Sequence, residues 1–158
     1  MYRIGQSSDI HRFIEGSYIT LGGIQIEHNK GIDAHSDGDA LCHAIAEAIL
    51  GALALGDLGH HFPDTDDTYK GMSSLKILAE VVNIMDTKGY EVNNVDALIL
   101  IERPKMAPHI EMMRSNIASV LNTDKNNVSV KATRGEKIGF VGREEGVMAQ
   151  CVILLKQK

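Results

Sequence analysis

Predicted strands and predicted helices follow one another along the whole of this sequence. Apolar residues recur at helical spacing over three stretches, at about residues 39–55, 74–88 and 108–121. Short runs typical of β-strands lie around them, at residues 2–5, 17–26, 95–102, 127–133 and 146–156. Strands interspersed with helices in this way favour a single mixed sheet covered by helices, in an α/β or α+β fold. With 158 residues, a single domain over residues 1–158 can bury a proper core.

The composition argues against several functional classes. The formal net charge is −5 and no run of Lys or Arg stands out, which argues against a nucleic-acid-binding surface. No stretch is long and apolar enough to span a bilayer, and no targeting segment is visible. We therefore expect a soluble, cytoplasmic protein of bacterial type with no membrane partner. Cys42 and Cys151 lie among apolar residues without CxxC spacing, which favours two buried thiols over a disulfide or a zinc knot.

The segment "SSDIH" brings a carboxylate and an imidazole to one face of the chain. Asp9 and His11 are two residues apart, and in an extended segment such residues point to the same side. We expect the strand at residues 2–5 to run into a polar turn that holds them. The alternative is a surface Asp and His near a strand end, and a third ligand nearby would argue against it.

The first predicted helix offers such a ligand. His43 and Glu47 follow at i, i+4 spacing on a polar face, away from the apolar stripe. A solvated face is the alternative, and we favour it for Glu47, whereas His43 stands among small residues that leave room for a ligand. If the turn packs against this helix, Asp9, His11 and His43 make the three-ligand set of a catalytic Zn²⁺ site with one open position.

The residues just before this helix are also polar. Asp39, one turn before His43, is expected to support a metal ligand. Asp37 is assigned only a turn-and-cap role. His35 and Ser36 could donate to an anion near the helix N-terminus, where the helix dipole favours negative charge.

Three further polar segments stand out in the sequence. Residues 56–71 are predicted to form a loop, with turn chemistry for Asp66 and Asp67. Lys105, at the end of a buried strand, could border a ligand site or simply be solvated. Residues 131–146 are richer in charge and glycine than a plain hairpin loop requires, although a hairpin loop is the alternative.

Six motifs, in this order, connect the sequence to a known family. They are "DIH", "AHSDGDALCHA", "LGALALGDLGHHFPDTD", "RPKMAPHI", "VKAT" and "EKIGFVGREEG". Together they resemble the 2-C-methyl-D-erythritol 2,4-cyclodiphosphate synthase family over essentially the whole chain. The resemblance implies a phosphorus–oxygen lyase of non-mevalonate isoprenoid biosynthesis. Such an enzyme converts 4-diphosphocytidyl-2-C-methyl-D-erythritol 2-phosphate to the 2,4-cyclodiphosphate and releases CMP. A homotrimer with active sites between neighbouring subunits is also implied.

The same resemblance implies roles for individual residues. It makes Asp9, His11 and His43 ligands of Zn²⁺, and it makes Glu136 a ligand of a second divalent cation, Mg²⁺ or Mn²⁺, that bridges the diphosphate. Asp9, His11 and Glu136 also count among the substrate contacts. The other implied contacts are His35 and Ser36 for phosphate, Asp57, Gly59, Phe62 and Asp64 for the methylerythritol part and its adjoining stretch, Pro104, Lys105, Met106, Ala107, Ala132 and Thr133 for cytidine, and Phe140 and Arg143 near the trimer axis.

Two positions depart from the family pattern. Residues 5–7 read Gly-Gln-Ser where the family has Gly-x-Gly, which would stiffen the backbone there. Arg134 stands where the family has a second Thr thought to support the transition state. A guanidinium can bind phosphate oxygens better than a hydroxyl, so Arg134 joins His35 and Thr133 as catalytic candidates. The alternative is that Arg134 points away and leaves Thr133 to act alone.

The implied reaction needs positioning more than it needs a base. The nucleophile would be the substrate's own 2-phosphate, and the sequence shows no Ser-His-Asp or Cys-His pattern. Charge neutralisation by metals and a folded-back substrate would carry the intramolecular cyclisation. Two other classes stay as alternatives: a phosphohydrolase that uses the same zinc with water as nucleophile, and a non-catalytic trimeric binding module with a structural zinc.

Overall fold

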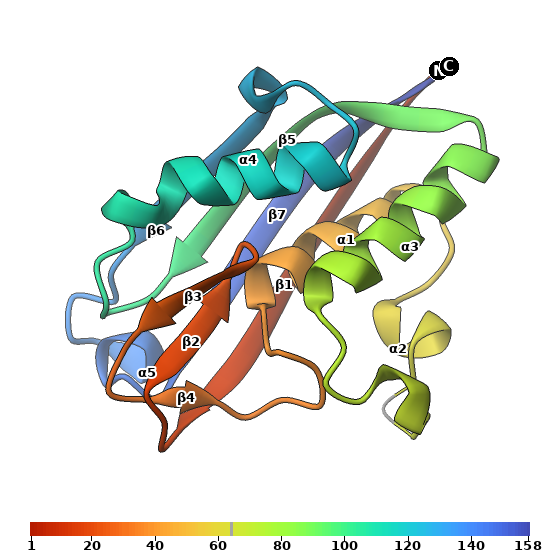
Figure 1. The fold of residues 1–158 in the computed structure, drawn as a ribbon. Helices are drawn as coiled ribbons and strands as arrows, with labels where there is room; N and C mark the ends of the chain where they lie inside the picture. The colour runs from red at the N-terminus through yellow and green to blue at the C-terminus, as the bar shows by residue number, and fades with distance from the viewer. Residues whose placement is uncertain (64) are drawn as a thin grey trace.

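The computed structural model describes residues 1–63 and 65–158, and its centre is a five-stranded sheet (Figure 1). The strands are β1 (Tyr2–Ile14), β4 (Gly31–Ile32), β5 (Tyr90–Leu100), β6 (Val128–Thr133) and β7 (Gly146–Gln157). They lie in the order β4-β1-β7-β5-β6. All neighbours pair antiparallel except β5 and β6, which run parallel. The mixed sheet expected from the order of segments is therefore confirmed.

Three helices lie together on one face of this sheet (Figure 1). They are α1 (Ala40–Ala52), α3 (Ser74–Thr87) and α4 (Ile110–Val120). Strand β7 shows how the two faces differ, because Ile153 and Leu155 are buried in the core whereas Gln150 and Val152 are exposed. Side chains alternate along a strand, so the sheet has one apolar face under the helices and one open face.

Helix α1 packs directly on β1, and Gly5 makes this close approach possible. A Cβ placed on Gly5 would lie 1.9 Å from the carbonyl oxygen of Ala48 and 2.9 Å from the Cβ of Ala52. Only glycine fits between strand and helix at this point. Because the helix rests on the strand, the beginning of α1, which carries His43, is held against the part of β1 that carries Asp9 and His11.

The structure corrects the prediction for the first strand. Strand β1 continues to Ile14 instead of turning after residue 5, so Asp9 and His11 lie inside a strand, opposite Ala149 and Val147 of β7. Long strands need partners along their whole length, and β7 supplies them. The expected shared face of Asp9 and His11 is kept, since the backbone there is extended.

Two polar segments contain short helices that the sequence did not predict. Residues 56–71 include α2 (Leu58–His61) and a 3₁₀ turn at Asp67–Tyr69, and residues 134–145 include α5 (Gly139–Gly142). Further 3₁₀ turns lie at Ala107–His109 and Lys125–Asn127.

The remaining expectations for the fold agree with the structure. The hairpin at Gly22-Gly23 joins β2 (Tyr18–Leu21) to β3 (Ile24–Glu27), which form a separate two-stranded sheet. Cys42 and Cys151 are both buried and both free. Among the described residues, no helix combines the length and the apolar character that a membrane crossing requires.

Candidate metal centre and active site

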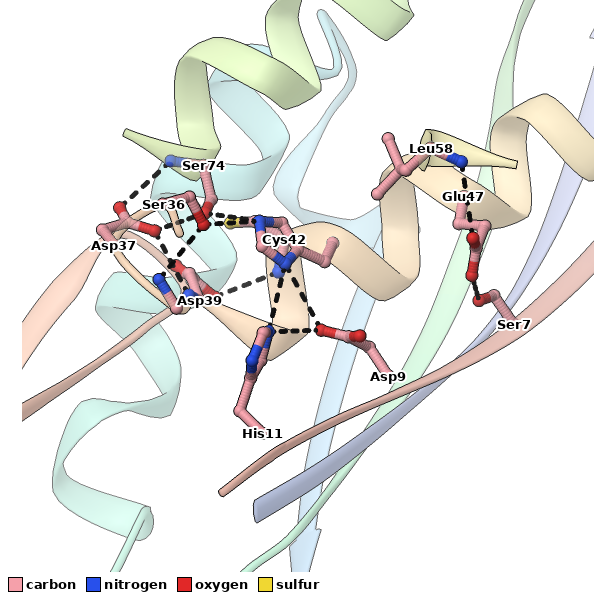
Figure 2. A network of polar contacts seen from close by, with 12 residues as sticks. Ser7, Asp9, His11, Ser36, Asp37, Asp39, Cys42, Glu47, Leu58 and Ser74 are labelled. Carbon is pink, nitrogen blue, oxygen red and sulfur yellow. Dashed lines mark hydrogen bonds and ion pairs between the residues drawn. The ribbon is translucent and has the colours of Figure 1, made fainter. Parts of the chain in front are cut away.

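Asp9, His11 and His43 bring three potential metal ligands to one point. The Oδ2 atom of Asp9 lies 2.9 Å from Nε2 of His11 and 3.3 Å from Nδ1 of His43, and the two nitrogens are 3.3 Å apart. Figure 2 shows Asp9 and His11 pointing from β1 toward the helix. The two segments whose packing could not be known from the sequence therefore meet.

The spacing of these atoms fits a tetrahedral metal ion. Ligand atoms bound to zinc at about 2.0–2.1 Å, at the corners of a tetrahedron, are about 3.3 Å from one another. The three distances in the protein are 2.9, 3.3 and 3.3 Å. In addition, Oδ2 of Asp9 is buried and has no hydrogen bond of normal geometry among the described residues. A buried carboxylate oxygen beside two imidazole nitrogens is a donor set suited to Zn²⁺.

The contacts at this point shift the pKa values of Asp9 and His11. Burial alone would raise the pKa of Asp9, but the neighbouring His11 and His43 hold that pKa well below its usual range. Burial lowers the pKa of His11, yet Asp9 and the backbone of Asp33 outweigh it and raise the pKa overall. Asp9 is thus a charged carboxylate at neutral pH, as a metal ligand has to be.

Two serine hydroxyl groups contact Nε2 of His43, and they come from different segments of the chain. Nε2 of His43 lies 2.8 Å from Oγ of Ser74 and 3.2 Å from Oγ of Ser36. The Ser74 hydroxyl in turn donates to Asp37. Ser74 is the first residue of α3, and nothing in the sequence pattern marked it as part of a site.

Asp39 does not support a metal ligand, contrary to the expectation. Its carboxylate is fully buried and accepts hydrogen bonds from the backbone N–H groups of Cys42, Gly22 and Gly23. Gly22 and Gly23 both have positive φ, which allows two successive N–H groups to point at one carboxylate. Asp39 therefore caps α1 and ties it to the β2–β3 hairpin.

A cavity of about 380 Å³ opens at the three ligands. His35, Ser36, Gly59 and Phe62, all expected from the sequence, line it together with Asp9, His11 and His43. Nε2 of His35 is buried and has no partner among the described residues. Asp57 lies beside the cavity, where it caps α2 by accepting a hydrogen bond from the His60 backbone at 2.9 Å. Asp64, also expected here, lies outside the described residues.

Glu47 is not the solvated residue that the sequence suggested. It lines the same cavity, and its carboxylate accepts hydrogen bonds from the Ser7 hydroxyl at 2.6 Å and from the Leu58 backbone at 3.4 Å (Figure 2). It thereby joins β1 to the start of α2. The i, i+4 stripe that pointed to His43 includes Glu47, and that signal could have identified it.

A second cavity, of about 410 Å³, lies where β5 and β6 end. Its lining includes every residue expected around cytidine, namely Pro104, Lys105, Met106, Ala107, Ala132 and Thr133, as well as Arg134. Glu102 also lines it and accepts a hydrogen bond from the Gly135 backbone at 2.9 Å, a contact that the sequence did not suggest.

The two cavities stand apart on the same chain. Pairing across the sheet connects Asp9 to Ala149, Ala149 to Ile99 and Ile99 to Ala132, so Asp9 and Ala132 lie in one row. Three strand spacings separate them, which is about 14 Å. The chain therefore does not bring its two groups of site residues together by itself.

The remaining expected residues lie elsewhere. Phe140 and Arg143 line a third cavity beside Arg12 and Lys30. Glu136 is exposed in the turn after β6 and has a positive φ of 52°.

Comparison with known proteins gives a consistent result. The model of the YgbB family matches residues 2–156. A 2-C-methyl-D-erythritol 2,4-cyclodiphosphate synthase of Pseudomonas entomophila is 56% identical over 153 residues, which cover 97% of this chain and 98% of the relative.

Two solved structures have the same fold. A bifunctional IspDF of Campylobacter jejuni matches with a TM-score of 0.95 and 39% identity, covering 100% of this chain and 43% of that one. A Plasmodium falciparum IspF in complex with CDP matches with a TM-score of 0.87 and 35% identity, covering 99% of this chain and 97% of that one.

Proposed function

Since the chain belongs to the YgbB family and is similar along nearly its whole length to 2-C-methyl-D-erythritol 2,4-cyclodiphosphate synthases, we infer that it catalyses their reaction. It is an enzyme of isoprenoid precursor biosynthesis. It converts 4-diphosphocytidyl-2-C-methyl-D-erythritol 2-phosphate to 2-C-methyl-D-erythritol 2,4-cyclodiphosphate and releases CMP. The convergence of Asp9, His11 and His43 in one cavity is the structural observation that carries this proposal.

We propose that Asp9, His11 and His43 hold Zn²⁺. The tetrahedral spacing of their ligand atoms supports this assignment, and so does the buried Oδ2 of Asp9, which has no hydrogen bond of normal geometry among the described residues. When bound, the ion supplies positive charge beside the phosphoryl group that is transferred. A second cation, Mg²⁺ or Mn²⁺, is proposed at Glu136, whose carboxylate is exposed and free of ion pairs among the described residues.

The residues around the metal centre are proposed to orient the erythritol part of the substrate. His35 and Ser36 would donate to phosphate oxygens, and the unpartnered Nε2 of His35 supports this role. Gly59 and Phe62 line the cavity and would flank the carbon chain, with Asp57 beside them and Asp64 in the adjoining stretch. Holding the substrate in a folded-back conformation brings its 2-phosphate to its diphosphate and removes much of the entropic barrier to cyclisation.

The second cavity is proposed to bind cytidine. Pro104, Lys105, Met106, Ala107, Ala132 and Thr133 would surround the nucleoside. Arg134 lines the rim, and its guanidinium has no carboxylate partner among the described residues, so it is available for the diphosphate oxygens. Thr133 beside it would donate a hydroxyl to the same group.

We propose that the chain forms a homotrimer in which these two cavities meet across subunits. The separation of about 14 Å along one chain supports this, because the substrate links its two ends by a single diphosphate. The open face of the sheet offers a surface for association, since Ile4, Ile10 and Val152 are 71%, 55% and 48% exposed there. Phe140 and Arg143 would then lie near the trimer axis. The charged substrate cannot cross a bilayer unaided, and we propose the cytoplasm as the site of action.

Incubation of the purified protein with the cytidyl diphosphate substrate, with and without a chelator, tests the proposal. CMP and the cyclic diphosphate should appear together and should vanish with the chelator. A linear phosphate product would indicate a phosphohydrolase instead.

The variant His43→Ala separates a catalytic metal from a structural one. For a catalytic metal, turnover should fall by more than about 100-fold while the melting temperature of the metal-free protein stays near that of the wild type. A protein that unfolds on this change would favour the structural zinc of a binding module.

A further inference from the structure

Ser74 is a buried polar residue whose hydroxyl lies behind a proposed metal ligand. Its side chain is 0% exposed, and its Oγ is 2.8 Å from Nε2 of His43. Burying a hydroxyl costs free energy unless its hydrogen bonds are made, so both partners of this group are informative. One is His43, and the other is Asp37.

Asp37 holds Ser74 through two hydrogen bonds. One carboxylate oxygen accepts from the Ser74 hydroxyl, and the other accepts from the Ser74 backbone N–H at 3.0 Å (Figure 2). Ser73, the N-cap residue of α3, makes no capping bond with its own side chain. Asp37 therefore caps α3 from a distant segment and fixes the Ser74 hydroxyl at the same time.

The direction of these bonds decides where the proton of His43 lies. A serine hydroxyl can donate one hydrogen bond, and the Ser74 hydroxyl donates it to Asp37. The ionised carboxylate of an aspartate has no proton of its own to donate, so it can only accept. Oγ of Ser74 then offers only lone pairs to Nε2 of His43, so the contact at 2.8 Å is a hydrogen bond only when Nε2 donates. The Ser36 hydroxyl, which could donate to Nε2 instead, is more distant at 3.2 Å. In a neutral imidazole, a proton on Nε2 leaves Nδ1 without one. Nδ1 is the atom that faces Asp9 and His11.

We propose that Asp37 and Ser74 are positioning residues that hold His43 in the tautomer whose Nδ1 can bind a metal. The proposal rests on the proposed metal centre and adds two residues to it. Asp9 favours the opposite tautomer, because its Oδ2 could accept a hydrogen bond from a protonated Nδ1. That distance is 3.3 Å, whereas the Ser74 acceptor is at 2.8 Å, so the closer contact favours the proton on Nε2.

The same contacts fix the orientation of the ring. A half-turn of the imidazole would exchange Nδ1 with a carbon and would also remove Nε2 from Ser74. Metal-bound histidines commonly gain affinity from such a partner on the second nitrogen, and losing it typically lowers metal affinity about 10- to 100-fold.

Zinc affinity of the metal-free protein, measured by competition with a chromophoric chelator, tests the proposal. Ser74→Ala should weaken zinc binding about 10- to 100-fold, and Asp37→Asn should weaken it less, because an amide can still accept one of the two bonds. Ser73→Ala removes the neighbouring hydroxyl at the same helix end and should leave the affinity unchanged. Thermal melts of the metal-free variants show that each one is folded, and Asp37→Asn decides the matter should Ser74→Ala fail to fold.

The nitrogen-15 spectrum of the imidazoles gives a readout that does not depend on metal or on turnover. At mildly alkaline pH, His43 of the metal-free wild type should carry its proton on Nε2, and Ser74→Ala should shift the population toward Nδ1. A proton on Nδ1 in the wild type, or wild-type zinc affinity in Ser74→Ala, would overturn the proposal. A wild-type protein that binds no zinc would instead overturn the proposed metal centre, and the spectrum would still decide the tautomer.

Discussion

Replacing Gly5 by alanine should damage both the stability and the metal centre. The added Cβ would lie 1.9 Å from the Ala48 oxygen, more than 1 Å inside the 3.0 Å limit that real Cβ contacts respect. The obstacle is helix backbone, so α1 has to move as a whole. Overpacking costs about 1–3 kcal/mol, and a clash with helix backbone belongs at the upper end of that range, about 3 kcal/mol. For a chain of this size, that loss lowers the melting temperature by about 6–12 °C.

The shift of α1 also moves His43 away from Asp9 and His11. We expect zinc affinity to fall at least about tenfold, because the ligand atoms lose their tetrahedral spacing. Urea unfolding of the metal-free protein and chelator competition measure the two effects separately. Both should be run at one protein concentration so that association does not alter the comparison.

Gly51→Ala is the matched control within the same helix. A Cβ at Gly51 would meet nothing within 4 Å, and the residue is exposed in α1. This change should raise the free energy of unfolding by about 0.5–1 kcal/mol and leave zinc affinity as it is. The reasoning would be refuted by a Gly5→Ala protein that matches the wild type in both measurements.

Three further predictions concern the side chains of the sites and the core. Arg134→Thr should raise KM for the substrate about tenfold, the effect of losing one charge-assisted hydrogen bond, and unchanged steady-state kinetics would remove Arg134 from the site. Burial raises the pKa of Cys151 to about 12 and that of Cys42 well above its usual value, so a thiol reagent at mildly alkaline pH should label neither cysteine until the protein is unfolded in urea. Burial lowers the pKa of His11, but the effect of Asp9 is larger and the net pKa is raised. Protons should therefore compete with zinc for His11 already at pH values above the ordinary imidazole pKa of about 6.5. Zinc affinity measured by titration should accordingly decline as the pH falls through that raised pKa, and a flat profile would contradict the assignment.

Local patterns were enough to predict the three long helices and the faces that carry Asp9, His11 and His43. Helical spacing put His43 on a polar face, and alternation put Asp9 and His11 on one side of a strand. These are properties of neighbouring residues, so they hold although β1 is nine residues longer than expected. The length of β1 depends on pairing with β7, which lies more than a hundred residues away.

The contacts that support the ligands could not be predicted, since their partners are distant in sequence. From the sequence alone, Asp39 is the expected support for a metal ligand, and Asp37 has only a turn-and-cap role. The structure separates them, because the N–H groups of Gly22 and Gly23 occupy Asp39, whereas Ser74 connects Asp37 to the imidazole. Glu47 of α1 likewise has its partner, Ser7, forty positions earlier in the sequence, on β1.

The row of residues from Asp9 to Ala132 has a consequence for genetics. A subunit with His43→Ala keeps an intact second cavity, and a subunit with Ala132→Trp keeps an intact metal centre. Each variant is therefore defective in a different half of the proposed shared active site. Co-expression of two inactive alleles should then restore growth that depends on the pathway. With random mixing into the proposed trimers, up to about a quarter of the wild-type number of complete centres would form. Complementation between two alleles of one gene would thus support the proposal that each active site is formed by two subunits.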